Sequence, residues 1–290
     1  MRVAVIGANG QLGTDLIRVL KGANRFEPIP LTRPYFDVRN ASQVLEVLID
    51  LKPDVVINTA AFTRVDDCED QPALAFEVNT LGTRNVAIAC AELKCVLVHL
   101  STDYVFDGKK REPYTEEDLP NPINVYGVSK LAGEHFVRSI SQKYYIIRTS
   151  GLYGVAGSSG KGGNFVETMI RLAKEGKPIR VVNDQVLSPT YTLDLAYKVV
   201  ELMPTEAYGL YHITNSGQCS WYEFAGKIFK LLGLEPDFGP ITTKEFGARA
   251  RRPAYSVLSN EKLINIGLGF LRSWPEALKA YLEEKGRIRR

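Results

Sequence analysis

The chain has 290 residues, of which 45% are hydrophobic, and its 36 basic and 33 acidic residues leave a net charge of +3. This composition suffices for one large domain or two intertwined ones, and the near balance of charge argues against a nucleic-acid or anionic-membrane partner. No apolar run approaches the roughly 20 residues of a membrane span. The four cysteines and three histidines lack metal-ligand spacing, so we expect reduced thiols, a cytoplasmic location and no metal site.

The first half of the chain alternates short β-branched runs with amphipathic stretches. The strand candidates are 2–7, 27–32, 54–60, 95–103 and 144–150, and the helix candidates are 14–22, 41–53, 71–94 and 126–140. This alternation predicts an α/β fold with a doubly wound, Rossmann-like parallel sheet covered on both faces. We assign residues 1–150 to a dinucleotide-binding domain.

The pattern changes after residue 150. A glycine-rich loop at 151–164 is long enough to be a candidate lid over a site. Beyond it, helices are expected at 165–176, 192–203 and 220–233, and strands at 179–184 and 209–214. We therefore expect residues 151–290 to form mainly a smaller, mixed α/β substrate lobe, interleaved with the main sheet.

Three glycines follow the first strand at a spacing of three residues, namely Gly7, Gly10 and Gly13. In a dinucleotide site, such glycines allow a tight turn, a close approach of the backbone to a pyrophosphate, and close packing of helix on strand. The phosphates then meet a helix N-terminus, which favours anions. The alternative is a purely structural turn, but the place between first strand and first helix favours a cofactor.

The end of the second strand carries Thr32 and Arg33 where NAD-binding proteins usually have an acid. A hydroxyl and a guanidinium suit a 2′-phosphate, which favours NADPH over NADH. The alternative is that Arg33 is an ordinary surface charge. Asp37 and Val38, just downstream, could lie beside the adenine.

Polar residues also follow the third and fourth strands. Residues 58–63, after the third strand, are mostly small and end in Thr63. The fourth strand ends in Thr102 and Asp103. On the predicted helix that follows, Tyr126 precedes Lys130 by four positions. A neighbouring ammonium would lower the pKa of a phenol, about 10 when free, and tune it for proton transfer. The alternative is that Tyr126 and Lys130 only share a solvated helix face.

Several stretches together resemble the extended short-chain dehydrogenase/reductase superfamily and, within it, the dTDP-4-dehydrorhamnose reductase family. They span nearly the whole chain, and the last two are the most selective for the family: GANGQLG, NTAAFTRVDDCE, STDYVFDG, NVYGVSKLAGE, VNDQVLSPTYTLDLA and RRPAYSVLSNEKL.

The resemblance implies NAD(P)H-dependent reduction of the C4 ketone of a nucleotide-sugar, in a homodimer. Tyr126 would donate a proton to the carbonyl oxygen, Thr102 would polarise that carbonyl, and Lys130 would bind the nicotinamide ribose and lower the pKa of Tyr126. Thr102 and Asp103 would contact the substrate. The implied cofactor lining is Gly10, Gln11, Leu12, Thr32, Asp37, Val38, Ala61, Phe62, Thr63, Leu100, Tyr126 and Lys130.

Gly151 departs from the family pattern, and the role of Arg252 has an alternative. Gly151 stands where many members have a tryptophan that packs on substrate, and Leu152, Tyr153 or the glycine-rich loop would have to compensate. Arg252 is a candidate for gripping the substrate pyrophosphate, with a surface charge as the alternative. We expect Trp221 to pack in the core.

The family has been associated with Mg²⁺ at a dimer contact through glutamates, but no glutamates of this chain could be matched to that site. Two other functions are compatible with the sequence. One is an epimerase or dehydratase of another nucleotide-sugar. The other is a non-catalytic regulatory subunit of methionine adenosyltransferase.

Overall fold

Six parallel strands form the central sheet of the computed structural model, which describes residues 1–157 and 163–289. Their spatial order is β2-β1-β3-β4-β5-β10, which confirms the predicted fold class. The strands are β1 (Arg2–Ile6), β2 (Glu27–Leu31), β3 (Val55–Asn58), β4 (Val96–Thr102), β5 (Tyr144–Thr149) and β10 (Gly209–His212).

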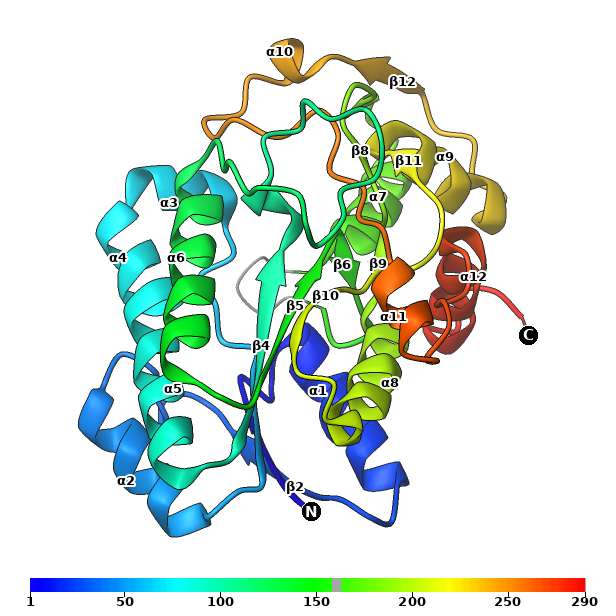
Figure 1. The fold of residues 1–290 in the computed structure, drawn as a ribbon. Coiled ribbons are helices and arrows are strands. Elements are labelled where there is room, and N and C mark those ends of the chain that lie inside the picture. The colour runs from blue at the N-terminus through cyan, green and yellow to red at the C-terminus, as the bar shows by residue number, and fades with distance from the viewer. Residues whose placement is uncertain (158–162, 290) are drawn as a thin grey trace.

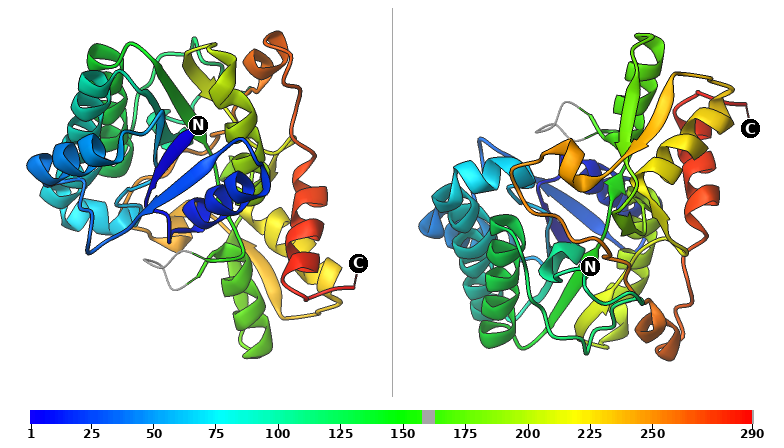
Figure 2. Two further views of the ribbon diagram at one scale, coloured as in Figure 1. Left: turned by 90° about the horizontal axis from the view of Figure 1, so that it is seen from below. Right: turned by 90° about the horizontal axis from the view of Figure 1, so that it is seen from above.

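Helices cover both faces of this sheet, as Figures 1 and 2 show. One face packs against α2 (Ala41–Leu51), α5 (Gly82–Leu93) and α6 (Val125–Ile140), and the other against α1 (Gln11–Gly22) and α8 (Thr192–Leu202). Side chains alternate along a strand, so β1 sends Val3 and Val5 into one core and Ala4 and Ile6 into the other. A strand buried on both faces reads as a continuous apolar run, as β1 does.

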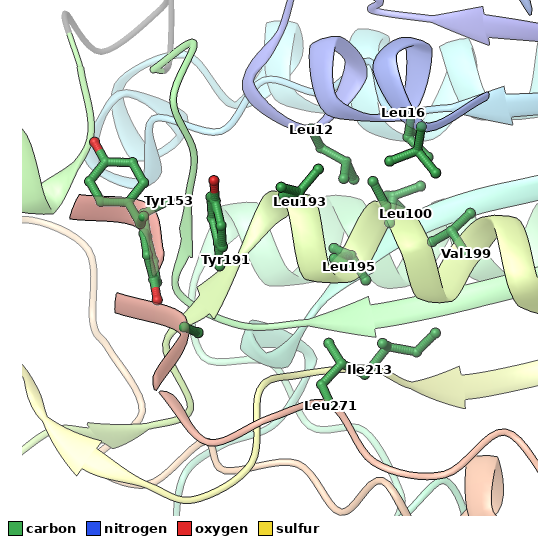
Figure 3. Packing of buried hydrophobic residues seen from close by; sticks show 14 of the residues in the cluster. Leu12, Leu16, Leu100, Tyr153, Tyr191, Leu193, Leu195, Val199, Ile213 and Leu271 are labelled. Atoms are coloured by element: carbon green, nitrogen blue, oxygen red, sulfur yellow. The ribbon is translucent and has the colours of Figure 1, made fainter. Parts of the chain in front are cut away.

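The core between α1, α8 and the sheet continues into the second half of the chain. Leu12 and Leu16 of α1 lie near Leu100 of β4 and near Val199 of α8, and Tyr191 belongs to the same cluster (Figure 3). A single apolar core therefore joins the two predicted halves, and the division at residue 150 stays a prediction.

The predicted helix at 71–94 is interrupted. It consists of α4 (Pro72–Phe76), a π-helical turn η1 (Glu77–Leu81) and α5, and it is preceded by a short helix α3 (Val65–Asp70) that the sequence did not predict. A π-turn inserts an extra residue into the helix and is frequent at functional sites. Apolar spacing alone carries no signal for it.

The remaining elements lie largely above the arrowheads of the main sheet, near its carboxyl edge (Figure 1). The strands pair as β6 with β9, β7 with β12, and β8 with β11. They are β6 (Leu152–Tyr153), β7 (Ile179–Val182), β8 (Val186–Leu187), β9 (Thr190–Tyr191), β11 (Cys219–Ser220) and β12 (Phe238–Ile241). The helices are α7 (Phe165–Lys174), α9 (Trp221–Leu232), α10 (Thr243–Phe246), α11 (Glu261–Asn265) and α12 (Trp274–Glu284), with 3₁₀ turns η2 (Asp103–Val105) and η3 (Met203–Thr205).

Within the described residues, no helix is long and apolar enough to cross a membrane. The strand that follows β1 in the chain, β2, lies on one side of β1 in the sheet, and the next strand, β3, lies on its other side. Ligands of open parallel sheets bind at such a switch point, beyond the carboxyl ends of the strands. The ends of β1 and β3 therefore indicate where to look for a site.

Candidate active site

The glycine turn after β1 has the geometry that a close backbone approach requires. Gly7 has φ +78°, a conformation that side chains disfavour, and its N–H donates to Leu31 of β2. A Cβ on Gly13 would overlap the Gly7 carbonyl oxygen and lie 2.8 Å from Ala8 Cα. The N-terminus of α1 therefore rests directly on the end of β1.

This helix N-terminus is open to an anion. Gly10 is its N-cap residue, no side chain caps the helix, and its first turn has no acidic residue. The first N–H groups of a helix lack partners within the helix and carry a partial positive charge. The turn and the uncapped helix together fit the phosphates of a dinucleotide.

A cleft of about 520 Å³ begins at this turn and runs along the carboxyl ends of the strands. Ten of the predicted cofactor residues line it: Gly10, Gln11, Leu12, Gly13, Arg33, Ala61, Thr63, Leu100, Tyr126 and Lys130. The predicted substrate residues Thr102, Asp103 and Gly151 line it as well.

Five predicted cofactor residues do not line the cleft. Gly7 lies beneath the turn, Thr32 accepts a backbone hydrogen bond from Phe36, and Val38 is buried in the core. Asp37 faces a separate, open depression and pairs with Arg39 at 2.6 Å, a bond that lowers the pKa of Asp37. Phe62 is held through its backbone.

Asn79 holds that backbone, and sequence reasoning missed it. Its amide accepts from the Phe62 N–H at 2.8 Å and donates to the Phe62 carbonyl and to Ser129 Oγ of α6, at 3.1 and 3.0 Å. This fully buried asparagine in the π-turn thus ties the loop after β3 to the helix of Tyr126. Little in the sequence signals this role, because the predicted helix at 71–94 contains a second asparagine and several other polar residues.

Local contacts fix the start of α6, which carries Tyr126 and Lys130. Asn124 caps the helix by accepting from the Gly127 N–H at 2.8 Å, and Glu69 of α3 accepts from the Val125 N–H at 2.8 Å. A Cβ on Gly127 would overlap the Tyr104 carbonyl oxygen. Only glycine therefore lets α6 approach the turn η2 so closely, which brings Tyr126 to Thr102.

Tyr126 lies half-buried at the cleft wall, which Thr102 also lines. Burial raises the pKa of Tyr126 above its usual value of 10, and the Thr102 hydroxyl opposes this shift. Lys130 is not among the main groups that shift this pKa, and its expected effect on Tyr126 stays a prediction. A raised pKa keeps the phenol protonated, which is the form a proton donor needs.

Lys130 is 2% exposed, and its Nζ donates to the Leu100 carbonyl at 2.5 Å and lies 3.5 Å from His99 Nε2. Burial lowers the pKa of Lys130 to about 8, and the charge of Glu134 opposes the shift. The pKa of Lys130 therefore lies closer to neutral pH than that of an exposed lysine, so its charge can change within the working range of pH.

Asp103 is also buried and receives three hydroxyl groups. Ser150 and Ser256 donate to its Oδ2 at 2.8 and 2.6 Å, and Thr102 donates to Oδ1 at 3.0 Å. Burial raises the pKa of Asp103 to about 6 despite these bonds. Asp103 is thus hydrogen-bonded to Thr102, and both line the cleft together with Tyr126.

Arg252 does not line the cleft. Its guanidinium donates to both carboxylate oxygens of Asp66 on α3, at 3.2 and 2.7 Å. In this arrangement the guanidinium is engaged by a carboxylate. The role of Arg252 as a pyrophosphate ligand stays a prediction, and it requires this ion pair to open.

The neighbourhood of Gly151 explains why a larger residue does not stand there. Gly151 has φ +55°, and a Cβ on it would lie 2.8 Å from Leu187 Cδ1. Leu152 lines the cleft, as the sequence suggested, whereas Tyr153 is 1% exposed and belongs to the core, so it cannot compensate. Of the loop at 151–164, residues 158–162 lie outside the described residues.

Trp221 was expected in the core, and that interpretation is incomplete. The residue packs on the core but also lines the cleft, with its ring 4.6 Å from that of Phe165. Phe165, Leu187 and Asn164 line the same cleft and were not predicted. They come from elements far apart in sequence, which local patterns do not bring together.

The described residues contain no group of three or more histidine, cysteine, aspartate or glutamate side chains that could hold a metal ion. The suggestion of Mg²⁺ is therefore without support from these residues.

Comparisons with known proteins agree with this geometry. Residues 1–287 match the family model described as the RmlD substrate binding domain. The chain is 44% identical over 284 residues to the spore coat polysaccharide biosynthesis protein SpsK of Bacillus subtilis, covering 98% of both chains. It is 39% identical to a dTDP-4-dehydrorhamnose reductase of Aggregatibacter actinomycetemcomitans, covering 97% of this chain and 99% of the other.

Among solved structures, the dTDP-4-dehydrorhamnose reductase of Bacillus anthracis in complex with NADP is similar, with a TM-score of 0.93 and 44% identity over 98% of this chain and 99% of the other. A UDP-glucose 4-epimerase of Thermotoga maritima shares the fold, with a TM-score of 0.83, at only 19% identity over 99% of each chain. The match over nearly the whole chain places this protein in the RmlD substrate binding domain family.

Proposed function

We propose that this protein reduces the C4 ketone of dTDP-4-dehydro-L-rhamnose to give dTDP-L-rhamnose, with NADPH as the reductant. The observation that carries the proposal is that Tyr126, Thr102 and Lys130 line the same cleft as the glycine turn of α1. Relatives 38–40% identical to this chain are named as reductases of closely related dTDP-4-keto sugars.

Bound NADPH would supply the hydride for the carbonyl carbon. Tyr126 would give its proton to the carbonyl oxygen, and the Thr102 hydroxyl would hold that oxygen in place. Lys130 would stabilise the phenolate that remains and would orient the cofactor ribose. The glycine turn at Gly10 and Gly13 would hold the pyrophosphate.

Arg33 supports the choice of NADPH. It lines the cleft and is exposed, and its charge helps to lower the pKa of Asp37, although no hydrogen bond or salt bridge of its guanidinium is found within the described part of the chain. Arg39, by contrast, is paired with Asp37. An unpaired guanidinium at the end of β2 is free to bind the 2′-phosphate, which NADH lacks. The NADP bound to the Bacillus anthracis relative supports the same choice.

The test is to follow the absorbance of reduced nicotinamide after adding freshly made dTDP-4-dehydrorhamnose to the purified protein. We expect one NADPH to be consumed per sugar and Tyr126→Phe to be nearly inactive. An epimerase or dehydratase would keep and recycle its NAD⁺, so it would consume no added NADPH. A regulatory subunit would give no turnover and would co-purify with a synthetase.

A homodimer and a cytoplasmic location remain predictions.

A further inference from the structure

A buried cluster of charged residues lies behind the cleft, on the sheet face that packs against α6. Arg148 of β5 and Glu134 of α6 are 0% and 1% exposed, and Lys130 lies one helical turn before Glu134. Two cations and one carboxylate thus share a space without solvent. Burying a charge is costly unless it is paired, so the way these charges pair decides the state of each.

Arg148 forms hydrogen bonds to both carboxylate oxygens of Glu134. Its Nε donates to Oε1 at 2.9 Å and its Nη2 to Oε2 at 2.7 Å, while Ser101 Oγ donates to Oε1 at 2.5 Å. Ser101 and Arg148 are direct neighbours on adjacent strands, so the sheet itself sets this arrangement. The guanidinium also lies 5.1 Å from the centre of the Phe106 ring.

Among the described residues, Lys130 forms no salt bridge with a carboxylate, and Glu134 acts on it only through its charge. Its Nζ turns to the Leu100 carbonyl and toward His99, and burial keeps His99 neutral by lowering its pKa well below the usual range.

We propose that Arg148 is a positioning residue: by occupying both oxygens of Glu134, it prevents an ion pair between Glu134 and Lys130 and leaves the Lys130 ammonium free to serve Tyr126 and the cofactor. This inference rests on the proposed function, because it assigns a use to Lys130. Arg148 does not contact Lys130 itself in this proposal; it acts on Lys130 through Glu134.

The titratable groups that surround Lys130 show which of them can change its charge. His99 faces it from β4 and Glu134 from α6, with Tyr126 one turn earlier on the same helix. The acids of α3 lie at the N-terminus of α6, where Glu69 accepts from Val125. Glu134 is therefore the carboxylate whose availability controls the charge of Lys130.

Two substitutions should move the charge equilibrium of Lys130 in opposite directions. Arg148→Met frees Glu134 to pair with Lys130, so the alkaline limb of the kcat/KM–pH profile should move up by about one pH unit. Glu134→Gln removes the carboxylate, so the same limb should move down. A merely structural role would lower activity or stability in both variants without shifting the limb in opposite directions.

The matched control is Arg138→Met. Arg138 also approaches Glu134, at 3.9 Å, but its side chain is 42% exposed. Solvent screens such a pair, so the limb should stay where it is in the wild type.

A titration of ¹³Cε-lysine signals by NMR, with the Lys130 signal assigned from Lys130→Met, reads the same equilibrium without turnover. Opposite shifts of the Lys130 signal in the two variants would support the inference, and unchanged or parallel shifts would overturn it. If Arg148→Met does not fold, Arg148→Lys replaces it. An ammonium lacks the planar fork that holds both oxygens, so an upward shift supports the inference and no shift overturns it.

Absent turnover in the wild type would reject the proposed function, while the NMR titration would still decide this inference.

Discussion

Replacing Gly13 with alanine tests whether α1 must rest directly on β1 to hold the cofactor. The added Cβ would lie 2.8 Å from Ala8 Cα and 2.9 Å from the Gly7 carbonyl carbon, where ordinary contact begins at 3.4 Å. Both neighbours are backbone atoms, so the helix itself must move, by at least about half an ångström. Overpacking of this kind costs about 1–3 kcal/mol of stability.

The same displacement carries the N–H groups of α1 away from the pyrophosphate. A hydrogen bond to a charged group contributes about 1.5–3 kcal/mol, so the loss of one weakens NADPH binding by roughly tenfold or more. Urea unfolding measures the first effect, and titration of the reduced-nicotinamide fluorescence measures the second.

Gly22→Ala is the matched control at the other end of the same helix. Among the described residues, no atom beyond the adjoining residues and the backbone of α1 itself lies within 4 Å of the added Cβ, so this variant should be about 0.4–1 kcal/mol more stable and should bind NADPH as the wild type does. A Gly13→Ala protein with wild-type stability and wild-type affinity would refute the reasoning about the turn.

Three further predictions concern the cleft. Tyr126→Phe removes the proton donor, so kcat should fall by roughly 10²–10⁴-fold while the Kd for NADPH changes much less, as steady-state kinetics and titration would show; equal losses in both would contradict a role in proton donation. Arg33→Ala should weaken NADPH at least about tenfold and leave NADH nearly unchanged, and a parallel loss for both cofactors would argue against a contact with the 2′-phosphate. Burial raises the pKa of Asp103 from 3.8 to about 6, so its proton stabilises the fold at low pH and this stabilisation is lost as the pH rises toward 6. Relative to Asp103→Asn, the wild type should therefore lose about 3 kcal/mol between about pH 4 and pH 7 in urea unfolding, and a pH-independent difference would show that this carboxyl is not shifted.

The parts of the site that depend on local spacing could be predicted from the sequence. Gly10 and Gly13 follow the first strand, and Tyr126 and Lys130 are one turn apart on a single helix, so their places follow from helix and strand geometry alone. The alternation of strands and helices predicted the doubly wound sheet for the same reason.

Contacts between distant segments could not be predicted. Arg252 pairs with Asp66, 186 positions away, and a guanidinium that looked free for phosphate is thereby engaged. Leu187 fills the space beside Gly151 in a similar way. Sequence patterns give the chemistry of such residues but not the partner that the fold brings to them.

The buried ion pair of Arg148 and Glu134 is another contact that the sequence could not predict. The sequence places Arg148 on a predicted strand and Glu134 on a predicted helix, but it does not show that the two charges are buried together as a pair. Only the register of β4 and β5 beneath α6 reveals that the two are partners and that Lys130 is not.

The central claim is that this protein transfers hydride from NADPH to C4 of a dTDP-4-keto sugar. The most direct measurement uses NADPH deuterated at the transferable C4 position, with dTDP-4-dehydrorhamnose as substrate, and examines the product by NMR. The account predicts deuterium at C4 of the sugar in an amount equal to the NADPH consumed. A product without deuterium, or no product while NADPH remains bound, would contradict it.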